Sequence, residues 1–181
     1  MWFGSQYGLN RYDGYNFKVF VNEDPNSLSG VFVGALFKDR DGMIWVGCGG
    51  FLDRSNPETE TSKRFPIELV NHISQDSGGT LWLATGKGLH SLNPATGAIR
   101  DYSHDPRDPS SLSSNDVKSS GEDKEGRFWV ATGEGLVEFD RETGKVALHV
   151  PLRETGREVS FYEDRFGVFW IIHISGNELA V

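Results

Sequence analysis

The sequence contains little cysteine and no long uninterrupted apolar run. Cys48 is the single cysteine among 181 residues, so no disulfide can form within the chain. No apolar run approaches the roughly 20 residues that a transmembrane helix needs. The first residues, MWFGSQYG, have neither the basic nor the apolar region of a signal peptide. We therefore expect no membrane span and no signal peptide in this chain.

Clusters of basic residues are also missing. The chain has 18 Lys and Arg residues against 26 Asp and Glu residues, which gives a formal net charge of −8. Nucleic acid requires a basic surface, and an anionic membrane attracts basic rather than acidic segments. We therefore expect no nucleic acid partner and no direct contact with a membrane.

The usual motifs of catalytic and metal sites are absent as well. There is no GxSxG and no HExxH, and TGKG at 85–88 is followed by Leu89 instead of the Ser or Thr of a P-loop. The DRDG segment at 39–42 lacks the downstream ligands of a calcium loop. The histidines show no metal-ligand spacing: His72, His90, His104, His149 and His173. We expect no enzyme activity, no cofactor and no metal.

Tryptophan is the clearest feature that is present. The five tryptophans recur with a period near 42 residues, at Trp2, Trp45, Trp82, Trp129 and Trp170. A period of this length indicates a repeat architecture. In four copies an Asp stands six residues before the Trp, and a Gly stands three residues after that Asp: Asp39 and Gly42, Asp76 and Gly79, Asp123 and Gly126, Asp164 and Gly167.

The repeated segments predict a turn followed by a buried strand. An Asp followed by Gly three residues later is typical of a type I turn, with the Gly at positive φ. The next residues, such as TLWLAT (80–85) and RFWVAT (127–132), are almost all apolar, which indicates a strand buried on both faces. A small residue two positions after the Trp would let a neighbouring sheet approach: Gly4, Gly47, Ala84 and Ala131. Ile172 breaks this pattern in the last copy.

A Gly-rich turn and two further short strands complete each copy. Four short strands in about 42 residues predict an all-β chain made of β-propeller blades, each with four antiparallel strands. The chain starts and ends within a blade, so we count about four and a half blades. The repeats fall near 1–38, 39–75, 76–122, 123–163 and 164–181. We expect residues 1–181 to form a single β-propeller domain or a fragment of one, either a partial propeller or one completed by an oligomer.

The shared pattern D-x-x-G-x-[LF]-W-V-[GA]-T-x-x-G-L resembles the two-component regulator propeller repeat. The segments DPRDPSSLSSNDV (105–117) and EDPNSLSGV (23–31) are similar to the linkers that join blades in that family. The sequence departs from the family pattern at three places: Cys48 where Thr is usual, the linker PIELV (66–70), and IIHISGNEL (171–179).

The resemblance implies the extracytoplasmic sensor region of bacterial hybrid histidine kinases, whose known ligands are largely polysaccharide-derived. On that basis we expect a non-enzymatic ligand-sensing module in signal transduction, periplasmic or extracellular, with an oligosaccharide as ligand. Two other functions stay open: a propeller enzyme (lyase or hydrolase) and a protein-interaction scaffold. A cluster of His and acidic residues on the loop face would favour the enzyme. Exposed aromatic residues on that face would favour the scaffold. A pocket with coplanar aromatic and acidic groups would favour the sensor.

We expect ligand contacts to come from loops rather than strands. In propellers the loops between second and third strands share one face with the linkers between blades. Residues that break the repeat on this face are the candidate ligand-binding residues: Tyr7, Lys87, Glu134, His173 and Asn177. We also expect either self-association through MWFGSQYG (1–8) or FWIIHISGNELAV (169–181), or contact of these ends with missing propeller blades.

Overall fold

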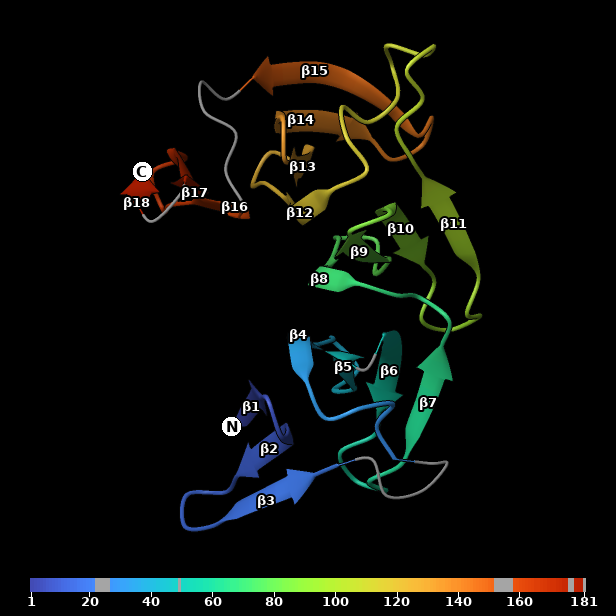
Figure 1. The fold of residues 1–181 in the computed structure, drawn as a ribbon, viewed down its shortest axis with the longest axis vertical. Coiled ribbons are helices and arrows are strands. Elements are labelled where there is room, and N and C mark those ends of the chain that lie inside the picture. The colour runs from blue at the N-terminus through green and yellow to red at the C-terminus, as the bar shows by residue number, and fades with distance from the viewer. Residues whose placement is uncertain (22–26, 49, 152–157, 176–177, 181) are drawn as a thin grey trace. The chain divides into compact units, whose positions relative to one another are not determined.

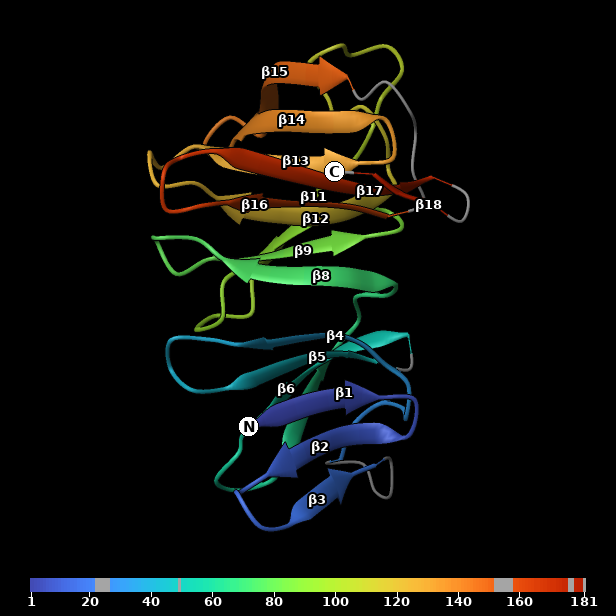
Figure 2. The same cartoon turned by 90° about the vertical axis from the view of Figure 1, so that its left-hand side faces the viewer.

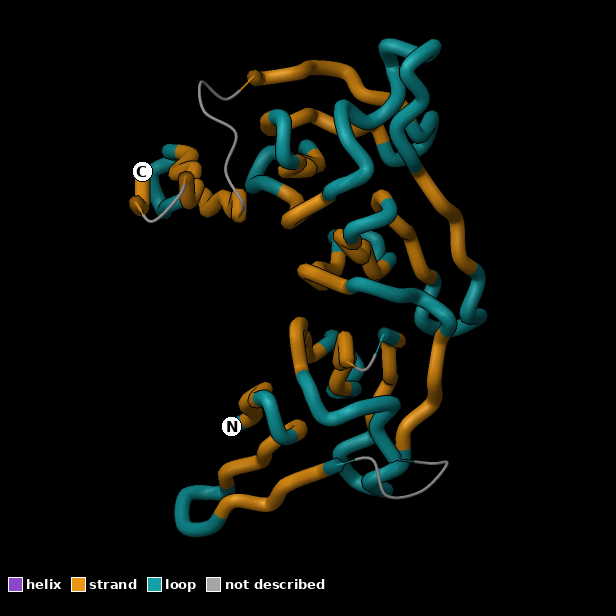
Figure 3. Tube along the Cα trace, in the orientation of Figure 1, coloured by secondary structure: helices purple, strands orange, loops and turns teal. Residues whose placement is uncertain are grey.

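The computed structural model describes residues 1–21, 27–48, 50–151, 158–175 and 178–180. These residues form strands and loops and contain no helix, as Figure 3 shows. Within the same ranges there is accordingly no helix long and apolar enough to cross a membrane.

The strands form five antiparallel sheets, each made of strands that are consecutive in the sequence. The first sheet consists of β1 (Trp2–Ser5), β2 (Gly8–Tyr12) and β3 (Phe17–Phe20). The second consists of β4 (Val33–Lys38), β5 (Ile44–Cys48), β6 (Phe51–Ser55) and β7 (Ser62–Phe65). The third consists of β8 (Val70–Gln75), β9 (Leu81–Thr85), β10 (Gly88–Leu92) and β11 (Ile99–Tyr102).

The last two sheets continue the same order. The fourth consists of β12 (Val117–Glu122), β13 (Phe128–Thr132), β14 (Gly135–Asp140) and β15 (Lys145–Pro151). The fifth consists of β16 (Glu158–Glu163), β17 (Phe169–Ser175) and β18 (Glu178–Ala180). The predicted all-β fold of blade-like sheets is therefore confirmed. Among the described strands, the first sheet lacks the first strand of the repeat and the fifth lacks the fourth.

The contacts divide the chain into two compact units, Met1–Ile73 (unit 1) and Ser74–Val181 (unit 2), with the boundary inside β8. Figure 1 and Figure 2 show the sheets of each unit from two directions. In unit 2, β12 to β15 succeed one another across their sheet in chain order. That residues 1–181 form a single propeller domain stays a prediction.

The four Asp-x-x-Gly turns are confirmed. The φ angle of their Gly residues lies between 81° and 86°, and each Gly N–H donates to the C=O of its Asp at 3.0–3.1 Å. The Asp carboxylate also accepts a hydrogen bond from the indole N–H of the Trp six residues later, at 2.7–3.0 Å in all four copies. This bond explains the constant Asp-to-Trp distance, because a buried indole N–H needs an acceptor.

The tryptophans of the four complete copies stand in apolar strands, which predicts that the rings are buried, and this is confirmed for three of the four. Trp45, Trp82 and Trp129 are 0%, 2% and 6% exposed, whereas Trp170 is 47% exposed. Trp82 packs against Phe128 and Phe139 of the fourth sheet. The prediction is wrong for Trp170, because no sheet follows β17 and β18 among the described residues to cover this ring.

The small residues after the tryptophans do allow neighbouring sheets to approach. A Cβ atom at Gly4 would lie 2.5 Å from Val33 Cγ1, and a Cβ atom at Gly47 would lie 2.9 Å from Val70 Cβ. Real Cβ atoms do not come this close to other atoms, so a larger side chain would push the next sheet away. Val33 and Val70 are the first residues of β4 and β8, and both contacts lie within unit 1.

Candidate functional site

The turn between β13 and β14 holds one of the predicted site residues. The Thr132 hydroxyl accepts the backbone N–H of Glu134 and donates to the C=O of Gly135, both at 3.2 Å. Gly135 has a φ of 154°, and a Cβ atom there would lie 2.5 Å from the Val150 carbonyl oxygen. Only Gly fits so close to a backbone carbonyl. The sequence TGEG (132–135) therefore fixes Glu134 at an exposed tip.

The linker between β11 and β12 folds into a loop closed by its own hydrogen bonds. The Asp105 carboxylate accepts the Arg107 N–H at 2.9 Å, and the Asp105 carbonyl accepts the Asp108 N–H at 2.9 Å. The Ser111 hydroxyl accepts the Asp105 N–H at 2.9 Å and donates to the Asp105 carbonyl at 3.0 Å. Asp and Ser side chains favour such turns because they bond nearby backbone groups. The loop is thus shaped before any ligand arrives.

Three contacts attach this loop to the fourth sheet. The Ser110 carbonyl accepts the backbone N–H of Val146 in β15 at 2.8 Å, and the two segments lie side by side in Figure 1. The Lys145 ammonium donates to the Asp108 carboxylate at 2.5 Å, which lowers the pKa of Asp108 to about 2. Leu112 is 1% exposed and belongs to a core cluster with Trp82 and residues of β13 and β14.

A cavity of about 240 Å³ lies between this loop and strands β14 and β15, entirely within unit 2. Part of its lining is apolar: Pro106, Pro109, Leu112, Val137 and Val146. The polar side chains of the lining are acidic or imidazole groups and hydroxyls: His104, Asp105, Asp108, Ser111, Ser113, Glu134 and His149. None of these residues is Lys or Arg. A preformed site with apolar walls and a few polar groups is the usual form of a small-molecule site.

The two histidines of the cavity are placed by different means. The His104 ring nitrogen Nδ1 lies 2.6 Å from the Leu112 carbonyl oxygen, so it carries the proton and donates, and Nε2 is left as an acceptor. The His149 ring lies against the turn, because its Nε2 would be 3.1 Å from a Cβ atom at Gly135. Both side chains are exposed and accessible to a ligand.

Val137 marks the point where the fourth sheet departs from the other copies. In the first three sheets a polar residue at this position bonds the last side chain of the second strand. The pairs are Asn10 to Ser5 at 3.1 Å, Cys48 to Asp53 at 3.3 Å and His90 to Thr85 at 3.2 Å. Val137 cannot form such a bond, and Thr132 instead bonds Ser113 of the linker at 2.9 Å. Val137 is also one of the residues that line the cavity.

The structure places the five predicted site residues separately. Glu134 lines the cavity. Tyr7 and Lys87 lie in the corresponding exposed turns of the first and third sheets and do not line it. His173 was expected in a loop, but it lies within β17, where its backbone pairs with Val159 and Ala180. Asn177 lies outside the described residues.

Sequence reasoning missed His104, Val137 and His149. One signal could have found Val137, since it is apolar where the aligned copies have Asn10, Asp53 and His90. The histidines were considered only as metal ligands, and no group of three or more potential ligands occurs among the described residues. Their approach to one cavity depends on the path of the linker, which no local pattern predicts.

A hydroxyl, an imidazole and a carboxylate do line up on the loop side of the third sheet. Thr85 Oγ1 lies 3.2 Å from His90 Nε2, and His90 Nδ1 lies 2.7 Å from Asp101 Oδ1. Thr85 is fully buried, and its hydroxyl donates to the Gly88 carbonyl at 2.8 Å. A nucleophile must be reached by substrate and must give its proton to the base. Thr85 meets neither condition, so this group braces the turn.

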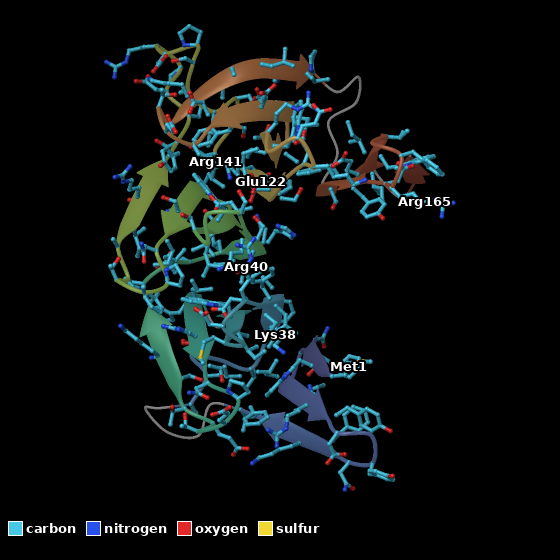
Figure 4. All side chains as sticks on the ribbon, turned by 180° about the vertical axis from the view of Figure 1, so that it is seen from behind. Met1, Lys38, Arg40, Glu122, Arg141 and Arg165 are labelled. Carbon is cyan, nitrogen blue, oxygen red and sulfur yellow. The ribbon has the colours of Figure 1, made fainter. Side chains whose placement is uncertain are left out.

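A second cavity, of about 500 Å³, lies at the opposite ends of these strands and includes Asp76, Trp82 and Arg141 in its lining. The Arg141 guanidinium lies 3.3 Å from the Asp76 carboxylate and 2.9 Å from that of Glu122, and Figure 4 shows Glu122 and Arg141 side by side. The Glu122 carboxylate also accepts the Ser77 hydroxyl at 2.8 Å. The charges of Asp76, Glu122 and Arg141 are thus paired with one another.

The loop side of unit 1 has a different character. Five of its exposed side chains are large and apolar: Tyr7 (78% exposed), Val31 (48%), Phe32 (59%), Phe51 (36%) and Leu69 (56%). Leu69 also has a positive φ of 53°, which is uncommon for a residue other than Gly. We call these five residues the unit 1 apolar patch. Exposed apolar patches often mark interaction surfaces.

Comparison with known families identifies the repeats. The sequence model described as two component regulator propeller matches residues 27–50 and 111–134. Two segments of the chain therefore match the repeat of this family. The second match covers the end of the linker, β12, β13 and the Glu134 turn, and so includes part of the cavity lining. The copy with the atypical PIELV linker is not matched.

Solved structures with the same fold include the extracellular domain of a two component system and two enzymes. The extracellular domain named for a hybrid two component system of B. thetaiotaomicron has a TM-score of 0.76 at 21% identity over 95% of this chain. Virginiamycin B lyase from Staphylococcus aureus has a TM-score of 0.68 at 15% identity over 94% of this chain. A gluconolactonase from Xanthomonas campestris has a TM-score of 0.63 at 18% identity over 96%.

These likenesses establish the propeller-type fold of the chain and no more. The chain spans 24% of the length of the first of these structures, 58% of the second and 64% of the third. A search of the curated proteins finds no match.

Proposed function

We propose that this chain is part of a non-enzymatic ligand-sensing module of a two-component sensor, located outside the cytoplasm, with a carbohydrate bound in the 240 Å³ cavity of unit 2. The cavity carries the proposal, because it is a preformed space with apolar and polar lining residues beside the position at which Val137 replaces the polar residue of the other copies. The regulator propeller repeats and the fold shared with an extracellular sensor domain support the rest.

The chemistry of the cavity fits a sugar. The half-buried Val146 and the exposed Pro109 offer an apolar surface for the C–H face of a sugar ring. The Glu134 carboxylate can only accept hydrogen bonds, and the Nε2 atom of His104 is also an acceptor, so both call for hydroxyl donors. The space suits one sugar unit, and the loop that closes it needs little reordering on binding.

The enzyme alternative has support only from fold neighbours. A lyase and a gluconolactonase share the fold, yet a shared fold does not fix function. Thr85, His90 and Asp101 follow one another as the hydroxyl, imidazole and carboxylate of a catalytic triad do. The Thr85 hydroxyl, however, is buried and donates its hydrogen bond to the Gly88 carbonyl. We therefore propose binding without turnover.

Calorimetric titration with neutral oligosaccharides of defined length tests the proposal. Replacing the exposed His149 by Ala should weaken binding about tenfold, since a hydrogen bond to the sugar would be lost. Lys87→Gln, in the matching turn outside the cavity, is the control and should leave affinity unchanged. Equal loss in both variants would mean that the cavity is not the site.

Protein binding is the second candidate function, and the unit 1 apolar patch is the observation that favours it. Leu69 is both exposed and in a strained backbone conformation, a combination that is costly unless the surface is used. The corresponding test selects peptides from a displayed library for binding to the natural chain, and the Phe32→Ser variant is used to remove peptides that bind elsewhere. Peptides rich in apolar residues that bind the natural chain and not the variant would support this function.

A further inference from the structure

We infer that the cavity of unit 2 selects uncharged sugar units over acidic ones such as uronic acids. The inference rests on the function proposed above, because it concerns the same site. It follows from the charges around the cavity, which neither the repeat pattern nor the fold determines.

The lining of the cavity has three carboxylates and two imidazoles but no Lys or Arg. Asp105, Asp108 and Glu134 contribute carboxylates, and no Lys or Arg side chain reaches the lining. Two cations lie near the cavity without lining it, and each is paired with a carboxylate of the lining. Arg107 pairs with Asp105 at 3.3 Å, and Lys145 pairs with Asp108 at 2.5 Å. An acidic ligand would therefore find no Lys or Arg in the lining to pair with.

A fourth carboxylate stands behind the Glu134 turn. Asp116 Oδ2 would lie 3.7 Å from a Cβ atom at Gly133, the residue next to Glu134, and the Gly133 N–H donates to the Asp116 carbonyl. Lys118 pairs with the Asp116 carboxylate at 2.8 Å, so this cation too is engaged. Among the described residues, Glu134 has no ion-pair partner, so it is the carboxylate of the lining whose negative charge is not balanced by a cation.

The same groups suit a neutral sugar. Carboxylates accept hydrogen bonds and cannot donate them, so hydroxyl groups satisfy them whereas a ligand carboxylate cannot. A ligand carboxylate would also face like charge in a partly desolvated space, where repulsion is stronger than in water. The cavity accordingly favours a hydroxyl over a carboxylate at the position nearest Glu134.

The chain offers its own matched variant. Glu134→Lys converts TGEG (132–135) into TGKG, the natural sequence of the equivalent turn at 85–88. Glu134 is exposed and its side chain is not part of the core, so the variant is expected to fold. Lys87→Glu makes the reverse change in the third sheet, away from the cavity lining, and serves as the control.

The experiment is calorimetric titration of the chain with paired probes of equal length. The neutral probes are oligosaccharides of glucose, mannose and galactose, and the acidic probes are oligosaccharides of glucuronic and galacturonic acid. At low salt we expect a neutral probe to bind at least about tenfold more tightly than its acidic counterpart. Glu134→Lys should reduce or reverse this preference, and Lys87→Glu should preserve it.

Each result decides between the two proposals. Acidic probes that bind as tightly as neutral ones, or more tightly, overturn the charge selection and leave the sensor function standing. A preference that Glu134→Lys does not change overturns the role of Glu134. Folded protein that binds neither class of probe overturns both the inference and carbohydrate binding at this cavity.

Discussion

The fourth and fifth copies of the repeat, at 123–140 and 164–180, share a local motif but differ in burial. In both copies the Asp carboxylate accepts the indole N–H, at 2.9 Å for Asp123 and Trp129 and at 3.0 Å for Asp164 and Trp170. The Gly of the turn has a φ of 83° in one and 81° in the other. Yet Trp129 is 6% exposed and Trp170 is 47% exposed. The turn and its hydrogen bonds form within one copy, whereas burial of the ring requires a neighbouring sheet.

The largest difference between these copies should appear when the rings are removed. Trp129→Ala should lower the free energy of unfolding by about 3–5 kcal/mol, because it leaves a cavity in the core. Trp170→Ala should cost within about 1 kcal/mol, since the ring is already half exposed. Chemical denaturation measures both. Similar losses in the two variants would show that Trp170 is covered in solution.

Glycine replacement should affect both copies alike. Gly126→Val and Gly167→Val each force a β-branched residue into positive φ, which costs on the order of 1–3 kcal/mol. The two losses, measured by chemical denaturation, should be similar because the strain is local. A much larger loss at Gly126 would mean that packing, and not the turn conformation, governs this position.

Acid should weaken the turn in both copies, because the pKa of Asp123 and that of Asp164 are both lowered. Burial raises the pKa of Asp123, but hydrogen bonds from Trp129 and Arg127 outweigh it and hold the pKa below the usual value. A folded-state pKa below the unfolded one gives stability that is present above about pH 4 and is lost as pH falls toward the folded pKa. Asp123→Asn should reduce this slope in a urea titration between about pH 5 and pH 2. An unchanged slope would argue against a charged Asp123.

Self-association is the weakest effect that we propose. Trp170 and Ile172 expose apolar side chains on the fifth sheet, and Phe17 and Val19 do so on the first. Light scattering at micromolar concentration should detect oligomers, and the variant with Trp170→Ser and Ile172→Ser should shift the distribution toward monomer. A monomer at all concentrations would contradict the proposal. The apolar side chains of the first and fifth sheets would then have to be covered by something other than a second copy of the chain.

The repeat made most of the fold predictable, and the candidate site much less so. The constant Asp, Gly and Trp positions predicted the turns and the second strands, and the φ angles confirm the turns. Glu134 was predicted as a site residue and does line the cavity. His173 was misplaced, because IIHIS continues β17 where other copies have a Gly-rich turn. His104 and His149 lie 45 residues apart in sequence, and only the folded linker brings them to one cavity.

The sequence by itself determined what depends on neighbours within one copy. The Asp-x-x-Gly turn, the Asp-to-indole bond and the tight TGEG turn each span a few residues, so local backbone geometry dictates them. The tertiary structure decided what depends on residues from different copies. The burial of Trp129 but not of Trp170 depends on whether another sheet lies against the ring. The cavity lies under the linker from Ser103 to Asp116, which Leu112 anchors in the core and which Ser110 joins to Val146 by a backbone hydrogen bond. Burial and long-range hydrogen bonds form only when distant segments pack, and no local sequence pattern contains them.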